Sequence, residues 1–193
     1  MSVFVFTFVA GITPGPNNMM LMTSGLNYGI KKSIPHYLGI CIGFPVMVAV
    51  VGFGIDAVFY KYPSIYLYLK VFGISYLLYL AWKIANSGNL KASPNIRKPF
   101  TFWQAASFQW LNPKAWVIAI GALAAFSIKE NFISSVLAVI SAYFYTGLIA
   151  MALWLKLGQI LRSFLHTELR VKYFNITMAL LLILSIIPIA FTV

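Results

Sequence analysis

Two asparagines and one lysine are the residues best suited to hold a small polar molecule, because all three fall inside long apolar segments. Asn17 and Asn18 belong to the stretch TPGPNN, residues 13–18, and Lys114 belongs to NPK, residues 112–114. An amide both donates and accepts hydrogen bonds, and a lysine ammonium donates to carboxylates or carbonyl oxygens. These residue types predict recognition of a small charged or zwitterionic solute.

The prolines of the same stretches predict interrupted helices. A proline lacks the N–H that would bond the carbonyl four residues back. Pro14 and Pro16 therefore free the carbonyls of Ala10 and Ile12, and Pro113 has the same effect in the second stretch. Unsatisfied backbone in hydrocarbon costs several kcal/mol per group, so it is tolerated only when buried in protein or lining a wet cavity.

The residues around the first break favour a binding site over a simple proline kink. Gly15 adds flexibility, and Asn17 or Asn18 can cap a half-helix that begins after the break. The N-terminus of that half-helix suits a carboxylate, while freed carbonyls suit an ammonium group, so an amino acid zwitterion fits both. We predict a substrate site formed by Pro14, Gly15, Pro16, Asn17, Asn18, Asn112, Pro113 and Lys114.

Lys114 has two interpretations that the sequence leaves open. A lysine near the middle of a membrane helix costs about 2.5–3.5 kcal/mol on insertion scales, so its side chain should face the protein interior. It either binds a substrate carboxylate or donates to the carbonyls that the prolines free, joining the broken helices. Helical spacing also places Gln104 and Ser107 on the face of Lys114, which predicts a partly polar stripe.

The elements that must position these residues are membrane helices. Of the 193 residues, 61% are hydrophobic and only 9% are charged, which is far from the balance of a soluble protein. Apolar stretches of about 20 residues are long enough to cross a bilayer as helices. The sequence predicts an all-α integral membrane protein with six transmembrane helices, the first and fourth interrupted, at about residues 2–24, 34–55, 64–83, 102–126, 132–155 and 173–192.

A polar segment divides the predicted single transmembrane domain, residues 1–193, into two halves. The first half is residues 1–85, the cytoplasmic linker is 86–100, and the second half is 101–193. Each half holds three spans, so related halves would have to be inverted relative to each other. Such 3+3 inverted repeats are common among secondary transporters.

The distribution of charge predicts the orientation. Basic residues gather after the first, third and fifth spans, whereas the connections after the second and fourth pair one lysine with one acidic residue. This alternation is typical of the positive-inside rule, so we expect cytoplasmic basic loops and both termini outside. The net charge of +11 thus indicates a lipid bilayer partner and no nucleic acid.

Other chemistry is poorly represented. The sequence contains no metal-ligand cluster, paired carboxylates or nucleophile elbow, which argues against an enzyme and indicates no cofactor. The three acidic residues lie in loops or at span ends. The sequence therefore has no acidic residue in mid-membrane that could relay protons, and it does not indicate which ion drives transport. His36 is expected to be an interfacial residue, and Cys41 is the lone cysteine.

Several motifs together carry a family pattern. They are TPGPNNMM at residues 13–20, GLNYGIKKS at 25–33, YLGICIG at 37–43, FGISYLLYLAWK at 72–83 and WLNPKAW at 110–116. In this order they resemble the LysE family of amino-acid exporters, also called the RhtB-type family. FQWLNPKAW is most similar to the branch that includes cysteine and O-acetylserine exporters.

The resemblance implies a function and a location. It implies a six-helix, multi-pass protein of the bacterial cytoplasmic (inner) membrane that exports amino acids or closely related metabolites by secondary transport. The family motif positions fall on residues 14–17 and 112–114, and we expect alternating access around them. The alternative is a non-transporting structural or regulatory membrane subunit, whose interrupted helices only shape packing. A channel is less favoured, because the sequence has no ring of charged residues and no repeated filter sequence.

Six spans leave little protein to surround an alternating cavity, which favours a homodimer. The pair Gly39 and Gly43 allows a close helix contact, either within the chain or with a second copy.

Overall fold

The computed structural model describes residues 2–55, 64–86, 98–164 and 167–191. Every regular element in these ranges is a helix, as the sequence predicts. The elements are α1 (Val3–Ile12), α2 (Pro16–Tyr28), α3 (Ile30–Val50), η1 (Val51–Ile55), α5 (Ser64–Ala85), α6 (Phe102–Leu111), α7 (Pro113–Phe126), η2 (Lys129–Asn131), α8 (Phe132–Phe164) and α9 (Glu168–Phe191).

Both predicted helix interruptions are present. α1 ends at Ile12 and α2 begins at Pro16, while α6 ends at Leu111 and α7 begins at Pro113. The two residues that precede the second half-helices have extended backbones: Gly15 has φ −176° and ψ −178°, and Asn112 has φ −91° and ψ 104°. In each case a proline opens the new helix, where its missing N–H costs nothing.

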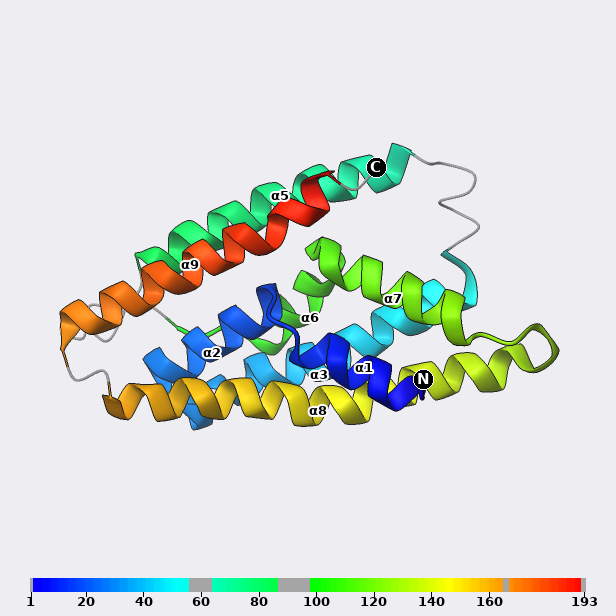
Figure 1. The fold of residues 1–193 in the computed structure, drawn as a ribbon, viewed down its shortest axis with the longest axis horizontal. Coiled ribbons are helices and arrows are strands. Elements are labelled where there is room, and N and C mark those ends of the chain that lie inside the picture. The colour runs from blue at the N-terminus through cyan, green and yellow to red at the C-terminus, as the bar shows by residue number, and fades with distance from the viewer. Residues whose placement is uncertain (1, 56–63, 87–97, 165–166, 192–193) are drawn as a thin grey trace.

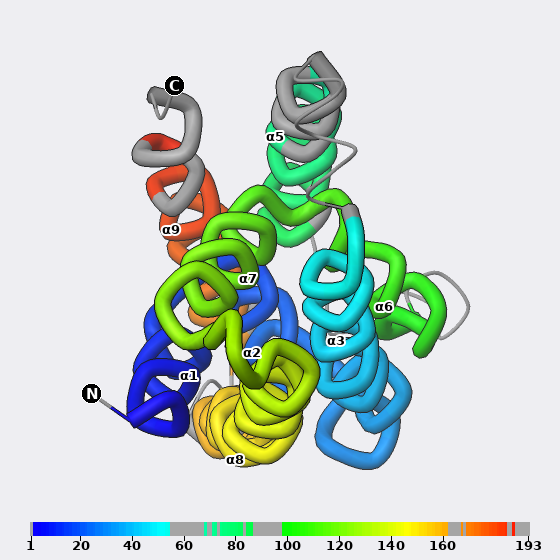
Figure 2. Tube along the Cα trace, turned by 90° about the vertical axis from the view of Figure 1, so that its right-hand side faces the viewer, coloured from blue at the N-terminus to red at the C-terminus, as the bar shows by residue number. Residues whose placement is uncertain are grey.

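The helices cross the molecule back and forth along its long axis (Figure 1). α8 runs along one side, α5 and α9 lie together on the other, and the broken segments α1–α2 and α6–α7 lie between them (Figures 1 and 2). The C-terminal ends of α2, α5 and α8 meet at one end of the molecule, and the start of α1 lies toward the other (Figure 1).

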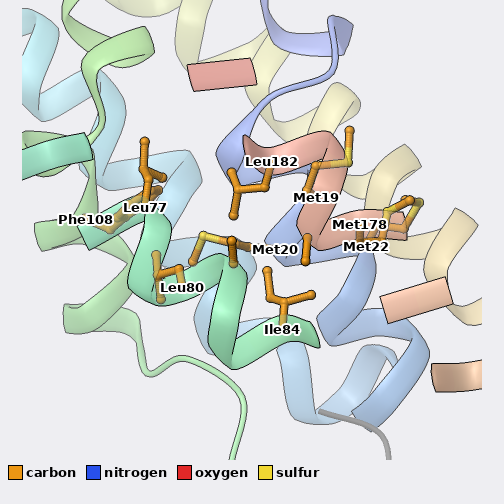
Figure 3. Close-up of a cluster of buried hydrophobic side chains, with 11 residues drawn as sticks. Met19, Met20, Met22, Leu77, Leu80, Ile84, Phe108, Met178 and Leu182 are labelled. Carbon is orange, nitrogen blue, oxygen red and sulfur yellow. The ribbon is translucent and has the colours of Figure 1, made fainter. Parts of the chain in front are cut away.

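α2 is the central helix, and all residues from Asn18 to Leu26 are buried. Its methionines Met19, Met20 and Met22 pack against α5 and α9, with Leu77 and Leu182 among their partners (Figure 3). On other faces α2 contacts α3 and α8. The residues that follow the first break are therefore held on several sides.

Glycines allow two close helix crossings. A Cβ added at Gly158 of α8 would meet the carbonyl of Met22 on α2, and one added at Gly43 of α3 would lie 2.6 Å from the Cα of Ala106 on α6. Gly39 likewise faces the backbone of Phe102. The predicted glycine contact of α3 is thus made within the chain.

Two stretches of the described chain are long and apolar enough to cross a membrane as continuous helices, Ile30–Gly54 and Lys129–Leu161. Val3–Ile12 and Pro113–Phe126 are apolar but shorter, because the breaks divide the segments to which they belong. The count of six spans remains a prediction.

Candidate substrate site

A cavity of about 60 Å³ lies beside both helix interruptions. By the same measure one water needs about 10–15 Å³, so the cavity has room for about four water-sized groups. Six of the eight predicted site residues line it, whereas Pro14 and Pro113 do not. The six are Gly15, Pro16, Asn17, Asn18, Asn112 and Lys114.

Lys114 joins the two broken segments. Its Nζ donates to the carbonyl oxygen of Thr13 at 2.8 Å and to that of Pro14 at 3.1 Å. One of the two interpretations left open by the sequence had the lysine donate to the carbonyls that the prolines free, those of Ala10, Ile12 and Gln109. The lysine does donate to carbonyls, but to different ones. The chain between α1 and α2 is extended, so the carbonyls nearest the lysine belong to the break itself.

Gly15 makes room for this lysine. A Cβ built on Gly15 would lie 2.8 Å from both Cδ and Nζ of Lys114, closer than real carbon atoms approach. The backbone at Gly15 is extended, so other residues could adopt its conformation. The need for glycine here comes from the lysine, and the predicted flexibility is not required to explain it.

Asn18 ties the end of α1 to the start of α2. Its Nδ2 donates to the carbonyls of Gly11 at 2.8 Å and Thr13 at 3.2 Å. The prediction that Asn17 or Asn18 caps the second half-helix is wrong, because the N-cap is Gly15 and has no side-chain cap. Asn18 instead satisfies carbonyls on the far side of the break.

Asn112 performs the capping role at the second break. Its side-chain oxygen accepts from the backbone N–H of Lys114 at 3.2 Å, which caps the start of α7. Pro113 follows at the first helical position, where its fixed φ suits the helix. These two residues set where α7 begins and therefore where the lysine side chain starts.

A buried glutamine that the sequence analysis did not select joins the two breaks. Gln109 is fully buried, and its amide exchanges two hydrogen bonds with Asn17. The distances are 2.9 Å from Asn17 Nδ2 to Gln109 Oε1 and 3.2 Å from Gln109 Nε2 to Asn17 Oδ1. A polar residue inside an apolar segment, close to the Asn-Pro-Lys break, is the signal that could have identified it.

The predicted polar stripe of Gln104, Ser107 and Lys114 is wrong. Gln104 forms a capping box with Thr101 at the start of α6, and both Gln104 and Ser107 are exposed. The helical spacing does not continue to Lys114 because the extended residue Asn112 interrupts it.

The remaining walls of the cavity combine apolar rings with a few hydroxyls. Phe44 of α3 and Tyr143 of α8 both line it and contact each other edge to face, with ring centroids 4.9 Å apart. Thr7 of α1 lines it as well and accepts a hydrogen bond from Thr146 of α8 at 3.1 Å. The described lining contains one cationic side chain, that of Lys114, and no carboxylate. It can therefore bind a small polar solute through an ammonium, amides and backbone groups.

Comparisons with known proteins place the chain in a family. Residues 8–187 match the family model described as LysE type translocator. Cysteine/O-acetylserine efflux proteins from Salmonella choleraesuis (strain SC-B67) and Salmonella typhimurium (strain LT2) are each 31% identical over 186 residues, covering 93% of this chain and 91% of the relative.

A protein of the same name from Escherichia coli (strain K12) is 28% identical over 182 residues, with 93% of this chain and 91% of the relative covered. No solved structure matches the chain.

Proposed function

The chain belongs to the LysE type translocator family, and we propose that it exports small amino acids or closely related metabolites through the cavity between its two helix interruptions. The similar proteins named for cysteine and O-acetylserine efflux suggest substrates of that size. The observation that carries the proposal is the side chain of Lys114, which lines the cavity and whose ammonium bonds the broken backbone at Thr13 and Pro14.

Lys114 can act on the substrate while it holds the broken backbone. A lysine ammonium has three N–H donors, and the carbonyls of Thr13 and Pro14 use two. The third can donate to a substrate carboxylate. The start of α2, with its first-turn N–H groups and partial positive charge, favours the same anionic group.

The substrate ammonium group needs hydrogen-bond acceptors elsewhere in the cavity lining. The side-chain oxygens of Asn17 and Asn112 belong to lining residues, and the Thr7 hydroxyl lies in the same wall. Because no carboxylate lines the described cavity, binding of the amino group depends on neutral oxygens. This favours weak binding and easy release, as transport requires.

Alternating access requires that contacts between the halves break and form again. The Asn17–Gln109 amide pair and the Lys114 contacts both connect residues 1–85 with residues 101–193. Hydrogen bonds between membrane helices average about 0.6 kcal/mol in measured cases, so the neutral Asn17–Gln109 pair can open. The stronger contacts of the Lys114 ammonium can be exchanged for a contact of similar kind with the substrate carboxylate. We propose rocking of one half against the other about this site.

Helix packing supports an inverted relation between the halves. α1 packs on α8 of the other half, and α6 packs on α3 of the other half, while α3 contacts α8 and α5 contacts α9. In an inverted repeat α1 would correspond to α6, α3 to α8 and α5 to α9. Under this correspondence the α1–α8 contact becomes the α6–α3 contact, and the other two pairs are unchanged. We therefore propose six spans in a 3+3 inverted repeat within one transmembrane domain.

The positions of the basic residues support the proposed orientation. The exposed side chains of Lys31, Lys32, Lys98, Arg170 and Lys172 belong to segments at the end of the molecule where α2, α5 and α8 finish (Figure 1). We propose that this end faces the cytoplasm and that both termini lie outside the inner membrane.

Efflux measurements on site variants test the proposal. Cells that express Pro16→Ala, Asn17→Ala or Lys114→Ala should lose export of cysteine and O-acetylserine while the proteins still accumulate in the membrane. The non-transporting subunit predicts the reverse, because the same changes would reduce abundance and no solute flux would depend on the chain. Normal export by all three variants would remove the proposed site.

A further inference from the structure

A second cavity, of about 70 Å³, lies on the cytoplasmic side of the proposed orientation. It is bounded by the second half of α2, by α3 and α5, and by residues 98–100. Met20, Leu80 and Ile84, labelled in Figure 3, form its apolar side. Its polar side is formed by Thr23, Ser24, Asn27, His36 and Lys98.

Three of these polar side chains have buried atoms without a hydrogen-bond partner within the described ranges. The atoms are Oγ1 of Thr23, Nδ2 of Asn27 and Nδ1 of His36. Thr23 is only 5% exposed and His36 only 3% exposed. Buried polar atoms are nearly always hydrogen-bonded in folded proteins, so three such atoms around one cavity indicate a polar occupant.

A stripe on α2 leads from the first cavity to the second. Asn17 lines the first cavity, and Met20, Ser24 and Asn27 follow at spacings of three and four residues in the lining of the second. Residues with this spacing share one helix face. Ten residues of helix span about 15 Å, which is half the thickness of a hydrocarbon core of about 30 Å.

We propose that the second cavity is a cytoplasmic entry site that binds the substrate, a zwitterionic α-amino acid, before it reaches the cavity at the helix breaks. This inference rests on the proposed export function and assigns a separate site to it. The carboxylate accepts from the Asn27 amide and from the Lys98 ammonium at the exposed rim. The amino group donates to the Thr23 hydroxyl and to the His36 ring.

The hydrogen-bonding capacity of each polar side chain fits this role. Asn27 Nδ2 can only donate, so it needs an acceptor such as a carboxylate oxygen. A threonine hydroxyl accepts as well as donates, and an uncharged imidazole has one acceptor nitrogen. The cavity therefore offers donors and acceptors at once, which matches a zwitterion better than a simple anion.

Transport kinetics measured from each side of the membrane test the entry site. Inside-out vesicles and right-side-out vesicles that contain the protein are supplied with radiolabelled L-cysteine under reducing conditions, and initial rates are fitted for half-saturation. Thr23→Val should raise the half-saturation concentration at the cytoplasmic face about ten- to a hundredfold, the effect of losing one hydrogen bond to a charged group. The maximum rate from the cytoplasmic face should rise by a similar factor, because the lost contact stabilises only the bound ground state and the overall equilibrium fixes the ratio of maximum rate to half-saturation. Both constants for the outer face should stay unchanged.

Thr23→Val is the informative variant because valine has nearly the shape of threonine and removes a hydroxyl that no described residue satisfies. We therefore expect normal folding and abundance. Thr177→Val is the matched control, because Thr177 is an exposed threonine of α9 that bonds only its own helix, at the carbonyl of Tyr173. Asn27→Leu, compared with the exposed Asn131→Leu, repeats the test on the carboxylate side.

Each outcome separates this inference from the export function. Unchanged cytoplasmic half-saturation in both Thr23→Val and Asn27→Leu would show that the cavity holds water only, and would overturn the entry site while export stands. Equal changes at both faces would also overturn it, since they indicate a structural role. If the unsubstituted protein moves no amino acid from either side, the export function fails and the entry site fails with it.

Discussion

Replacing Gly15 with alanine should displace the side chain of Lys114 without removing it. The variant therefore tests whether export requires the ammonium in its observed position. The extended backbone at Gly15 accepts an alanine without strain, so the chain should fold. The new Cβ would lie 2.8 Å from Cδ and Nζ of Lys114, and the side chain must move away. The ammonium then loses its place on the carbonyls of Thr13 and Pro14.

The size of the effect follows from those two contacts. They are 2.8 Å and 3.1 Å long and each involves a charged donor. A hydrogen bond to a charged group contributes about 1.5–3 kcal/mol. If transport needs the ammonium in this place, losing one contact slows export by about 10- to 150-fold, at about 1.4 kcal/mol per factor of ten.

The assay is initial-rate export of cysteine, normalised to the amount of folded protein in the membrane. Gly121→Ala is the matched control, because Gly121 is an exposed residue of α7 and an added Cβ meets nothing within 4 Å. Combining Gly15→Ala with Lys114→Met should be no worse than Lys114→Met alone, since both act through one ammonium. Export by Gly15→Ala at the rate of Gly121→Ala would show that export does not require the ammonium of Lys114 at the carbonyls of Thr13 and Pro14.

Three further predictions concern the contacts that hold the site. Asn17→Leu and Gln109→Leu should show a coupling of about 1 kcal/mol in a double-mutant cycle of thermal stability, because each removes both hydrogen bonds between the two amides and Gln109 keeps only its bond to the carbonyl of Ala105; additive effects would contradict the pairing. Asn18→Leu should lower the free energy of unfolding by about 1–3 kcal/mol, because the carbonyl of Gly11 loses the Asn18 amide and that of Thr13 keeps only Lys114; unchanged melting in detergent would argue against this role. Gly158→Val should cost about 1–3 kcal/mol or more by forcing α2 and α8 apart, whereas Gly121→Val is the control and should remain close to the unsubstituted protein.

Much of the architecture could be predicted from the sequence because the bilayer constrains it strongly. Long apolar stretches separated by polar connections predicted the helices, and prolines with neighbouring amides predicted both breaks. Helix ends were less accurate: α8 continues to Phe164 and α3 begins at Ile30, whereas the apolar stretches end at 155 and begin at 34. Hydropathy marks the hydrocarbon layer, while a helix can continue into the polar region beyond it.

The partners within the site could not be predicted from spacing. Gln109 pairs with Asn17 across 92 positions of sequence, and Lys114 meets carbonyls about 100 positions away. Such contacts depend on how the two broken segments lie side by side. Helical periodicity failed for Gln104 and Ser107 because the break at Asn112 ends the helix on which the spacing was counted.

Solute uptake by inside-out vesicles is the direct test of export through the Lys114 site. Vesicles that contain the protein are compared with vesicles that contain Lys114→Met, using radiolabelled cysteine and O-acetylserine beside a panel of other amino acids, with and without a proton or sodium gradient. We expect saturable uptake of a small amino acid that depends on Lys114. No uptake under any gradient, or equal uptake by both proteins, would contradict it.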